Sequence, residues 1–163
     1  MGRRGGLRGW HLLLMLPLLG TVAAEEPPLF FDVLDGQPLN LSPLPGEELS
    51  EAVLEFHHTG RNPYHNDAEA REEGRKLYLA HCAFCHGRAG EGALGPPLDG
   101  TDWTYAISAT DAGMFSIIHG GAYGGMDSFA RRGMHQDEML RIIAFVRTLQ
   151  DCVGCLAARG DGR

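Results

Sequence analysis

The stretch Cys82-Ala83-Phe84-Cys85-His86 decides how this chain folds. Two cysteines separated by two residues, with a histidine directly after the second, form the motif that attaches a c-type haem. In that motif the two thiols bond to the porphyrin, and the histidine binds the iron beneath it. The motif therefore predicts one covalent haem held by Cys82, Cys85 and His86.

Cys-x-x-Cys pairs also occur in thiol oxidoreductases and in zinc sites. A zinc site needs a second ligand pair, and Cys152 and Cys155 lie far downstream in a tail of small residues. A redox pair leaves the adjacent His86 without a role. Haem attachment is the interpretation that uses every residue of the motif.

The first 24 residues have the pattern of a secretory signal peptide. Three arginines precede an apolar run over residues 12–19, and small residues end at Ala24, where we expect cleavage. The run is too short to span a bilayer. Because haem c is joined to the chain outside the cytoplasm, we expect a periplasmic protein.

The chain is acidic, with 14 Lys and Arg, 21 Asp and Glu, and a net charge of -7. Among Lys, Arg, Asp and Glu, residues 1–24 contain only three arginines, so cleavage of the signal peptide makes the net charge of the mature chain more negative. Such a charge favours basic partners and disfavours nucleic acid binding.

Three segments follow the signal peptide: an N-terminal extension over 25–66, a haem domain over 67–151 and a tail over 152–163. In the extension, residues 29–34 and 39–41 flank Asp35-Gly36, a pattern typical of two short strands around a turn. Residues 47–56 then predict a short helix with Leu49, Val53 and Phe56 on one side.

The sequence of the haem domain predicts three helices in an all-α fold. Asp67 is the expected N-cap of the helix that carries the motif, and apolar or small residues recur on one face of that helix: Ala70, Gly74, Leu77, Tyr78 and His81. Gly74 weakens a helix interior, so we expect another helix to approach it closely.

The expected partner is the last helix, over residues 136–150, with one apolar stripe: Met139, Ile142, Ile143, Val146 and Leu149. A third helix, over 111–119, is predicted to begin at a cap on Asp111 and to bury Met114, Phe115 and Ile118.

The sixth iron ligand separates an electron carrier from a gas-binding protein. Met126 is the favoured candidate, because the glycines of residues 120–125 let the backbone wrap closely around a planar ligand. Met134 is the next candidate, and His119 or His135 would give a bis-histidine site.

Three further residues are candidate haem contacts. Pro96 follows the motif at a distance where its carbonyl oxygen can accept a hydrogen bond from the far nitrogen of His86. Trp103 and Tyr105 carry ring donors that can reach a haem propionate, or they are ordinary core aromatics.

The chain resembles the class I cytochromes c. Gly74, Tyr78 and Cys82 have the family's spacing, and residues 141–146, with Phe145 in the aromatic place, resemble its terminal helix. The resemblance implies three main helices around one haem, with His86 and Met126 as axial ligands and the Pro96 carbonyl supporting His86.

A narrower resemblance, to cytochrome cL, rests on residues 91–96, 103–105, 115, 120–122 and 137–140, and on the extension. It implies an electron carrier, not an enzyme, that accepts electrons from a quinoprotein methanol or alcohol dehydrogenase. The electrons would pass to another cytochrome c or a terminal oxidase. Calcium is also implied, without assignable ligands. His135 stands where the family usually has a Ser or Thr cap.

Two other functions stay open at this point. A haem-based sensor or gas-binding protein would have a labile sixth ligand. Cys152 and Cys155 are expected to pair with each other in an oxidising compartment, and a thiol oxidoreductase built on them is the third hypothesis.

Overall fold

A computed structural model describes residues 1–2 and 29–150 of the chain. The predicted signal peptide falls mostly outside these residues, as do Cys152 and Cys155. Within the described residues, no helix is long and apolar enough to cross a membrane.

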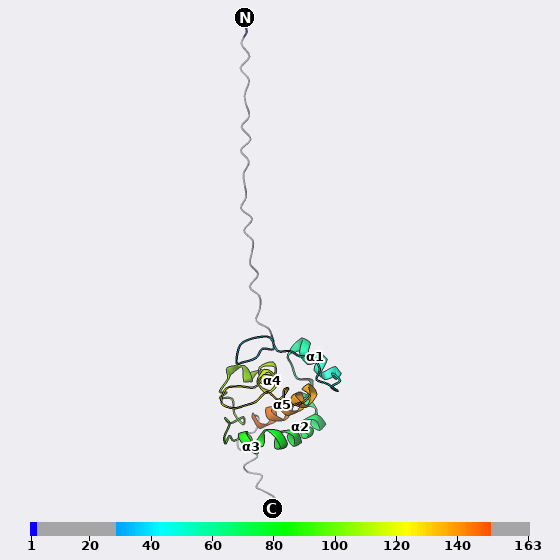
Figure 1. Ribbon diagram of the computed structural model, residues 1–163, viewed down its shortest axis with the longest axis vertical. Coiled ribbons are helices and arrows are strands. Elements are labelled where there is room, and N and C mark those ends of the chain that lie inside the picture. The colour runs from blue at the N-terminus through cyan, green and yellow to red at the C-terminus, as the bar shows by residue number, and fades with distance from the viewer. Residues whose placement is uncertain (3–28, 151–163) are drawn as a thin grey trace, which may run out of the picture.

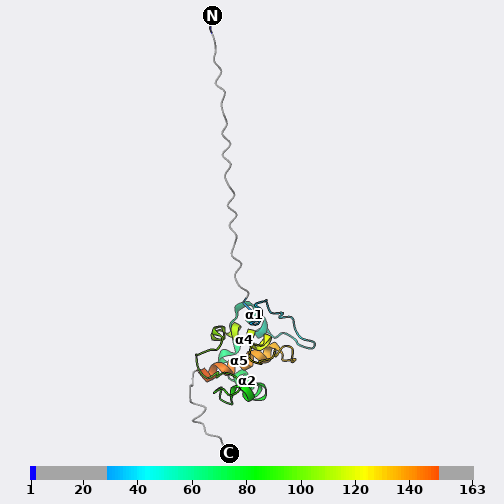
Figure 2. The same ribbon diagram turned by 60° about the vertical axis from the view of Figure 1, so that its left-hand side comes forward.

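The described chain is helical, with no sheet between residues 29 and 150. The order of elements is α1 (Glu51–Thr59), α2 (Ala68–His81), α3 (Ala83–His86), α4 (Asp111–Gly120) and α5 (Gln136–Gln150). Two short 3₁₀ helices, η1 (Pro63–Asn66) and η2 (Ala106–Ala109), precede α2 and α4. Both views place α5 between α2 and α4 (Figures 1 and 2).

The packing of α2 on α5 is the main helix contact, and Gly74 lies at its centre. A β-carbon on Gly74 would overlap the backbone carbonyl of Arg141, so only glycine allows this approach. The ring of Tyr78 packs 5.2 Å from that of Phe145 across the same contact. The predicted close approach at Gly74 is therefore confirmed.

The predicted start of α2 is confirmed as well. Asp67 accepts hydrogen bonds of 2.9 Å from the backbone N–H groups of Glu69 and Ala70. The expected face is buried at Ala70, Gly74 and Tyr78, but His81 is exposed. His81 is the last residue of α2, and its side chain is not part of the buried face.

The stripe of α5 is buried as predicted, and so are Met114, Phe115 and Ile118 of α4. The cap of α4, however, is Thr110 and not Asp111. Thr110 Oγ1 accepts from the N–H of Gly113 at 3.0 Å. Asp111 is the first helical residue, and its carboxylate pairs with Arg147 of α5 at 2.8 Å.

The predicted hairpin of the extension is reduced to one antiparallel bridge between Phe31 and Pro38. Asp32 N–H donates to Gln37 O at 2.8 Å, and Leu39 N–H to Phe30 O at 3.2 Å. Pro38 has no N–H to extend the ladder, so strands do not form on either side of it.

The helix predicted over residues 47–56 begins at Glu51 and ends at Thr59. Ser50 is its cap, and Glu47 lies before it. The carboxylate of Glu47 instead accepts from the N–H of Leu44 at 2.7 Å and from the N–H of Gln136. Val53 and Phe56 are buried as expected, and Leu49 is partly buried against the core.

Candidate haem site

The Cys-x-x-Cys-His motif lies where α2 gives way to the single turn of α3. Cys82 N–H still donates to Tyr78 O at 2.8 Å, and His86 N–H donates to Cys82 O at 2.9 Å. This turn holds both cysteines and His86 on a short, rigid segment. Cys82 is partly buried against the core, while Cys85 is exposed.

The loop after the motif folds back onto His86. Nδ1 of His86 lies 2.8 Å from the carbonyl oxygen of Pro96, the contact that the sequence predicts. Nδ1 donates here, because a carbonyl can only accept, so Nε2 carries the lone pair. The ring therefore has one nitrogen fixed by the chain and the other available to a metal.

Gly95 allows this arrangement of the loop. Its N–H donates to Cys85 O at 2.8 Å, and a β-carbon there would lie 2.8 Å from Cε1 of His86. A larger residue at this position would press on the imidazole ring. The loop is tied further by Gly92 N–H to His86 O at 2.8 Å and by Leu98 N–H to Gly90 O at 2.6 Å.

Tyr78 holds the chain on the other side of His86. Its hydroxyl donates to Gly87 O at 2.7 Å, and burial raises the pKa of this hydroxyl, so it stays protonated as a donor. The sequence predicts Tyr78 on the packed face of α2 but does not predict this hydrogen bond. The nine positions from Tyr78 to Gly87 carry no periodic signal that would have revealed it.

The state of the thiols bears on the redox-pair alternative. Within the part of the chain that the structure describes, both Cys82 and Cys85 are free. Burial raises the pKa of the Cys82 thiol to about 12. Because a catalytic dithiol needs a thiolate near neutral pH, Cys82 is poorly suited to thiol exchange.

Met126 lies in a glycine-rich loop that closes on itself. Ala122 N–H donates to Met126 O at 2.8 Å, and the two residues form an isolated antiparallel bridge. Gly121, Gly124 and Gly125 all have φ between 90° and 95°, which L side chains rarely adopt. These glycines are what allows the tight loop, and they leave Met126 partly buried against the core.

The other candidate ligands occupy different surroundings. Met134 is 7% exposed and belongs to the hydrophobic core. His119, on α4, is buried, and its ring packs 5.4 Å from that of Phe115. Burial lowers the pKa of His119, an effect that the nearby carboxylates of Glu47 and Asp32 oppose. His135 lies before α5, and its N–H donates to Glu138 Oε2 at 2.8 Å.

The two aromatic candidates lie in the segment between the motif loop and α4. Trp103 is partly buried against the core, and the guanidinium of Arg147 lies 5.8 Å from its ring. Tyr105, also partly buried, precedes η2 and accepts from Ser108 N–H at 2.9 Å. Their contact with a propionate stays a prediction.

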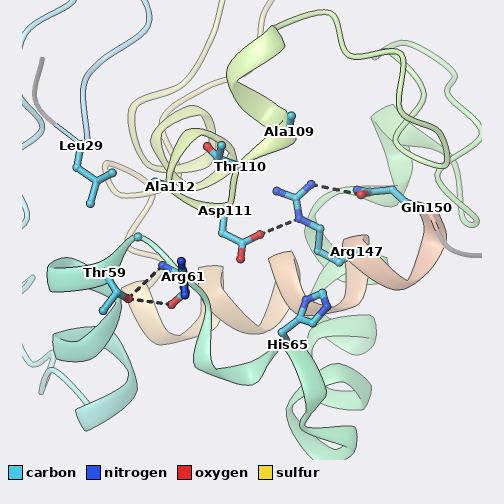
Figure 3. A pocket seen from close by; sticks show the side chains of 11 residues that line it. Leu29, Thr59, Arg61, His65, Ala109, Thr110, Asp111, Ala112, Arg147 and Gln150 are labelled. Atoms are coloured by element: carbon cyan, nitrogen blue, oxygen red, sulfur yellow. Dashed lines mark hydrogen bonds and ion pairs between the residues drawn. The ribbon is translucent and has the colours of Figure 1, made fainter.

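A surface cavity of about 540 Å³ is lined in part by Arg147, the residue whose guanidinium lies near Trp103 (Figure 3). Its wall is formed by the loop after α1, the start of α4 and the end of α5, where Asp111 pairs with Arg147. No residue of the haem motif lines it, so we do not assign the haem to it.

Comparisons with known proteins show the family to which this chain belongs. Residues 69–146 match the family model described as cytochrome C oxidase, cbb3-type, subunit III. The curated cytochrome c-L of Methylorubrum extorquens is 38% identical over 122 residues, or 74% of this chain. The chain spans 61% of the length of that relative.

Two crystal structures of cytochrome cL share the fold. The one from the marine methylotrophic bacterium Methylophaga aminisulfidivorans has a TM-score of 0.71 and 39% identity, over 74% of this chain and 80% of its own. The one from Hyphomicrobium denitrificans has a TM-score of 0.69 and 37% identity, over 74% of this chain and 73% of its own.

The helix arrangement, the motif and the His86–Pro96 hydrogen bond define a class I c-type cytochrome. Its prosthetic group is haem c. Within that class, the chain belongs to the cytochrome cL family.

The donor set fits the haem. Covalent attachment requires two free thiols and iron ligation requires an available imidazole nitrogen, and Cys82, Cys85 and His86 supply them. The calcium implied by resemblance has no such support. Among residues 29–150, no group of three or more His, Cys, Asp or Glu side chains is placed to hold a metal ion.

Proposed function

We propose that this chain is a periplasmic monohaem cytochrome that accepts single electrons from a PQQ-dependent methanol or alcohol dehydrogenase. It then passes them to another cytochrome c or to a terminal oxidase. The chain is an electron carrier and not an enzyme. We infer these partners from the membership of the chain in the cytochrome cL family.

One observation carries the proposal, the 2.8 Å hydrogen bond from His86 Nδ1 to the carbonyl oxygen of Pro96. Such a bond fixes the ring orientation and makes the other nitrogen a stronger ligand. A fixed His86 holds the fifth coordination position in both oxidation states. With Met126 as a permanent sixth ligand, the coordination does not change on electron transfer, which is what a one-electron carrier needs.

The remaining roles follow from the chain's own residues. Haem c, when bound, supplies the one-electron Fe(III)/Fe(II) couple. Cys82 and Cys85 would anchor it, and His86 and Met126 would bind its iron. Trp103 and Tyr105 would donate hydrogen bonds to its propionates.

Met126 is favoured over the other candidates because of its surroundings. Its loop is closed by the Ala122 N–H bond and is partly exposed, so the thioether has freedom to turn toward the iron. Met134 is packed into the core, and His119 lies against the extension near Asp32 and Glu47. A methionine ligand raises the reduction potential and suits an acceptor of electrons.

The test of the partner is direct mixing of the purified cytochrome with candidate dehydrogenases. A calcium-dependent methanol dehydrogenase, a lanthanide-dependent one and a dehydrogenase for longer alcohols are each given substrate, and haem reduction is followed by absorbance. We expect rapid reduction by at least one of them. Failure with all three would overturn the partner proposal.

The haem sensor is tested on the same material. Carbon monoxide is added to the reduced protein at neutral pH, and the spectrum is followed. A stable methionine ligand slows or prevents binding. Rapid, complete binding would contradict permanent ligation by Met126 and favour a sensor or gas-binding protein.

A further inference from the structure

The N-terminal extension contacts the segment that contains Met126 at three places. We define the methionine loop as residues 121–135, between α4 and α5. The part of the extension that precedes α1, residues 29–50, is drawn in blue and cyan beside α4 (Figure 1). It touches the residue before the loop, the tip of the loop and the residue that follows it.

The first contact is at Gly120, the last residue of α4. A β-carbon there would lie 3.3 Å from both Asp32 Oδ2 and Leu39 Cδ2. That spacing is tighter than ordinary side-chain contact, so the turn of the extension lies directly against the residue before the loop.

The second contact is at the tip of the loop. The Tyr123 hydroxyl donates to the backbone carbonyl of Leu34 at 3.1 Å. Tyr123 is 69% exposed, so its ring gains little from burial, and this hydrogen bond is the contact that holds it. Three residues later comes Met126.

The third contact is at Gln136, the first residue of α5. Its N–H donates to Glu47 Oε1, its side-chain Nε2 donates to Leu41 O at 3.1 Å, and its Oε1 lies 2.8 Å from His57 Nε2. Gln136 is 1% exposed, so these groups have no water to replace lost partners. The first N–H groups of a helix have no partner within the helix. At the start of α5, the carboxylate of Glu47 accepts from the N–H of Gln136, in place of a capping side chain on His135.

We propose that the N-terminal extension braces the methionine loop, with Tyr123 and Gln136 as positioning residues that keep Met126 on the iron. The extension holds the loop at both ends and at its tip, so opening the loop breaks contacts with the extension. Deleting one contact makes the open, methionine-free form more populated. This inference rests on the proposed role of Met126.

The test uses imidazole, which binds ferric haem only after the methionine has left. Its apparent affinity is proportional to the fraction of open loop. Tyr123→Phe removes only the hydroxyl that donates to Leu34. We expect the apparent imidazole affinity of the ferric holoprotein to rise about three- to tenfold, the range for one lost hydrogen bond.

The matched control is Tyr64→Phe. This change removes a hydroxyl that donates to Asp137 of α5 at 2.6 Å and accepts from Arg141 at 3.5 Å, and Tyr64 has no hydrogen bond to the loop tip. Its imidazole affinity should change less than about twofold, even where its melting temperature falls more. Equal increases in both variants would make the effect global and overturn the brace.

A second variant and a second readout extend the test. Glu47→Gln weakens the contact with Gln136 and is expected to raise the imidazole affinity in the same direction. The Ala122 N–H is hydrogen-bonded to Met126 O. Its hydrogen exchange should become faster in both Tyr123→Phe and Glu47→Gln, while the exchange rates of α2 amides should stay the same.

The outcomes separate the two proposals. If the ferric wild type lacks the weak red band of methionine-ligated haem, the role of Met126 is wrong and the brace is wrong with it. If the band is present but Tyr123→Phe and Glu47→Gln leave imidazole affinity and Ala122 exchange unchanged, the brace alone is overturned.

Discussion

Gly74 of α2 lies directly against the backbone carbonyl of Arg141 in α5, with no room for a β-carbon between them. The contact sets the distance between the two helices. α2 leads directly into the haem motif, and α5 is the central helix, so this distance also sets where Cys82 lies relative to the core.

Gly74→Ala should therefore be strongly destabilising. The obstacle is backbone of another helix, which cannot move aside as a side chain would, and we expect a loss of about 1–3 kcal/mol or more in the free energy of unfolding. Urea unfolding of the holoprotein measures it. Gly100→Ala is the control, because a β-carbon there meets nothing within 4 Å and should cost little. Equal losses would contradict the close approach.

Met126→Ala should lower the reduction potential and abolish the weak red band of the ferric protein, because the sulfur ligand is lost. Potentiometry and absorbance measure the two effects. Met134→Ala is the control: it empties part of the core and should cost about 2–5 kcal/mol of stability while keeping the band. A band that survives Met126→Ala would move the assignment to another methionine, with Met134 as the next candidate.

Gly95→Ala should disturb the hydrogen bond between His86 and Pro96. The new methyl group would lie 2.8 Å from Cε1 of His86 and push the ring. Weakening this bond makes the imidazole a poorer donor to ferric iron, so we expect the potential to rise by tens of millivolts. Potentiometry checks the direction. A fall, or no change with the variant folded, would show that the ring keeps its position.

His119 should make stability depend on pH. Burial lowers the pKa of His119 in the folded protein. The carboxylates of Glu47 and Asp32 oppose this lowering, and His57 adds to it. The unfolded chain therefore binds the proton more tightly. The contribution of His119 to the free energy of unfolding is therefore complete above about pH 6.5 and decreases as the pH falls toward the pKa of the folded protein. The loss is up to about 1.4 kcal/mol for each pH unit by which folding lowers the pKa.

Urea midpoints at several pH values between neutral and mildly acidic measure this dependence. His119→Gln should flatten the curve in that window. His58→Gln makes the same change at an exposed position and is the control. A slope that persists in His119→Gln would assign the dependence to another group.

Electron transfer from the dehydrogenase should slow as salt is added. The chain has a net charge of -7, and three of its arginines, Arg75, Arg141 and Arg147, are already paired with carboxylates of the chain. At 0.1 M ionic strength, attraction to a basic partner is largely screened beyond about 10 Å.

Stopped-flow measurement of haem reduction at increasing ionic strength tests this salt dependence. Reduction by an uncharged small reductant is the control, and equal rates at all salt concentrations would indicate apolar docking.

Much of the haem domain could be predicted from the sequence, because its signals are local. The motif carries its ligands within five residues, and the apolar periodicity of residues 136–150 predicts α5 with its bounds as observed. Gly74 predicts a close helix because glycine inside a helix has a cost that only packing offsets. Pro96 is placed at His86 by a short loop.

Other features could not be read in this way. The cap of α4 was predicted one residue late, because Thr110 and Asp111 are both good caps and only the contact of Asp111 with Arg147 distinguishes them. Two short apolar segments around an Asp-Gly turn predict a hairpin, but Pro38 lacks the donor that a second strand needs.

The sequence by itself determined that this chain carries a covalent haem on a helical fold, since covalent spacing and helical periodicity act over a few neighbouring residues. Only the tertiary structure decided where the extension lies. Glu47 and Gln136 are separated by 89 positions, and so are Leu34 and Tyr123. Hydrogen bonds between such distant residues depend on the packed position of both segments, which no local pattern encodes.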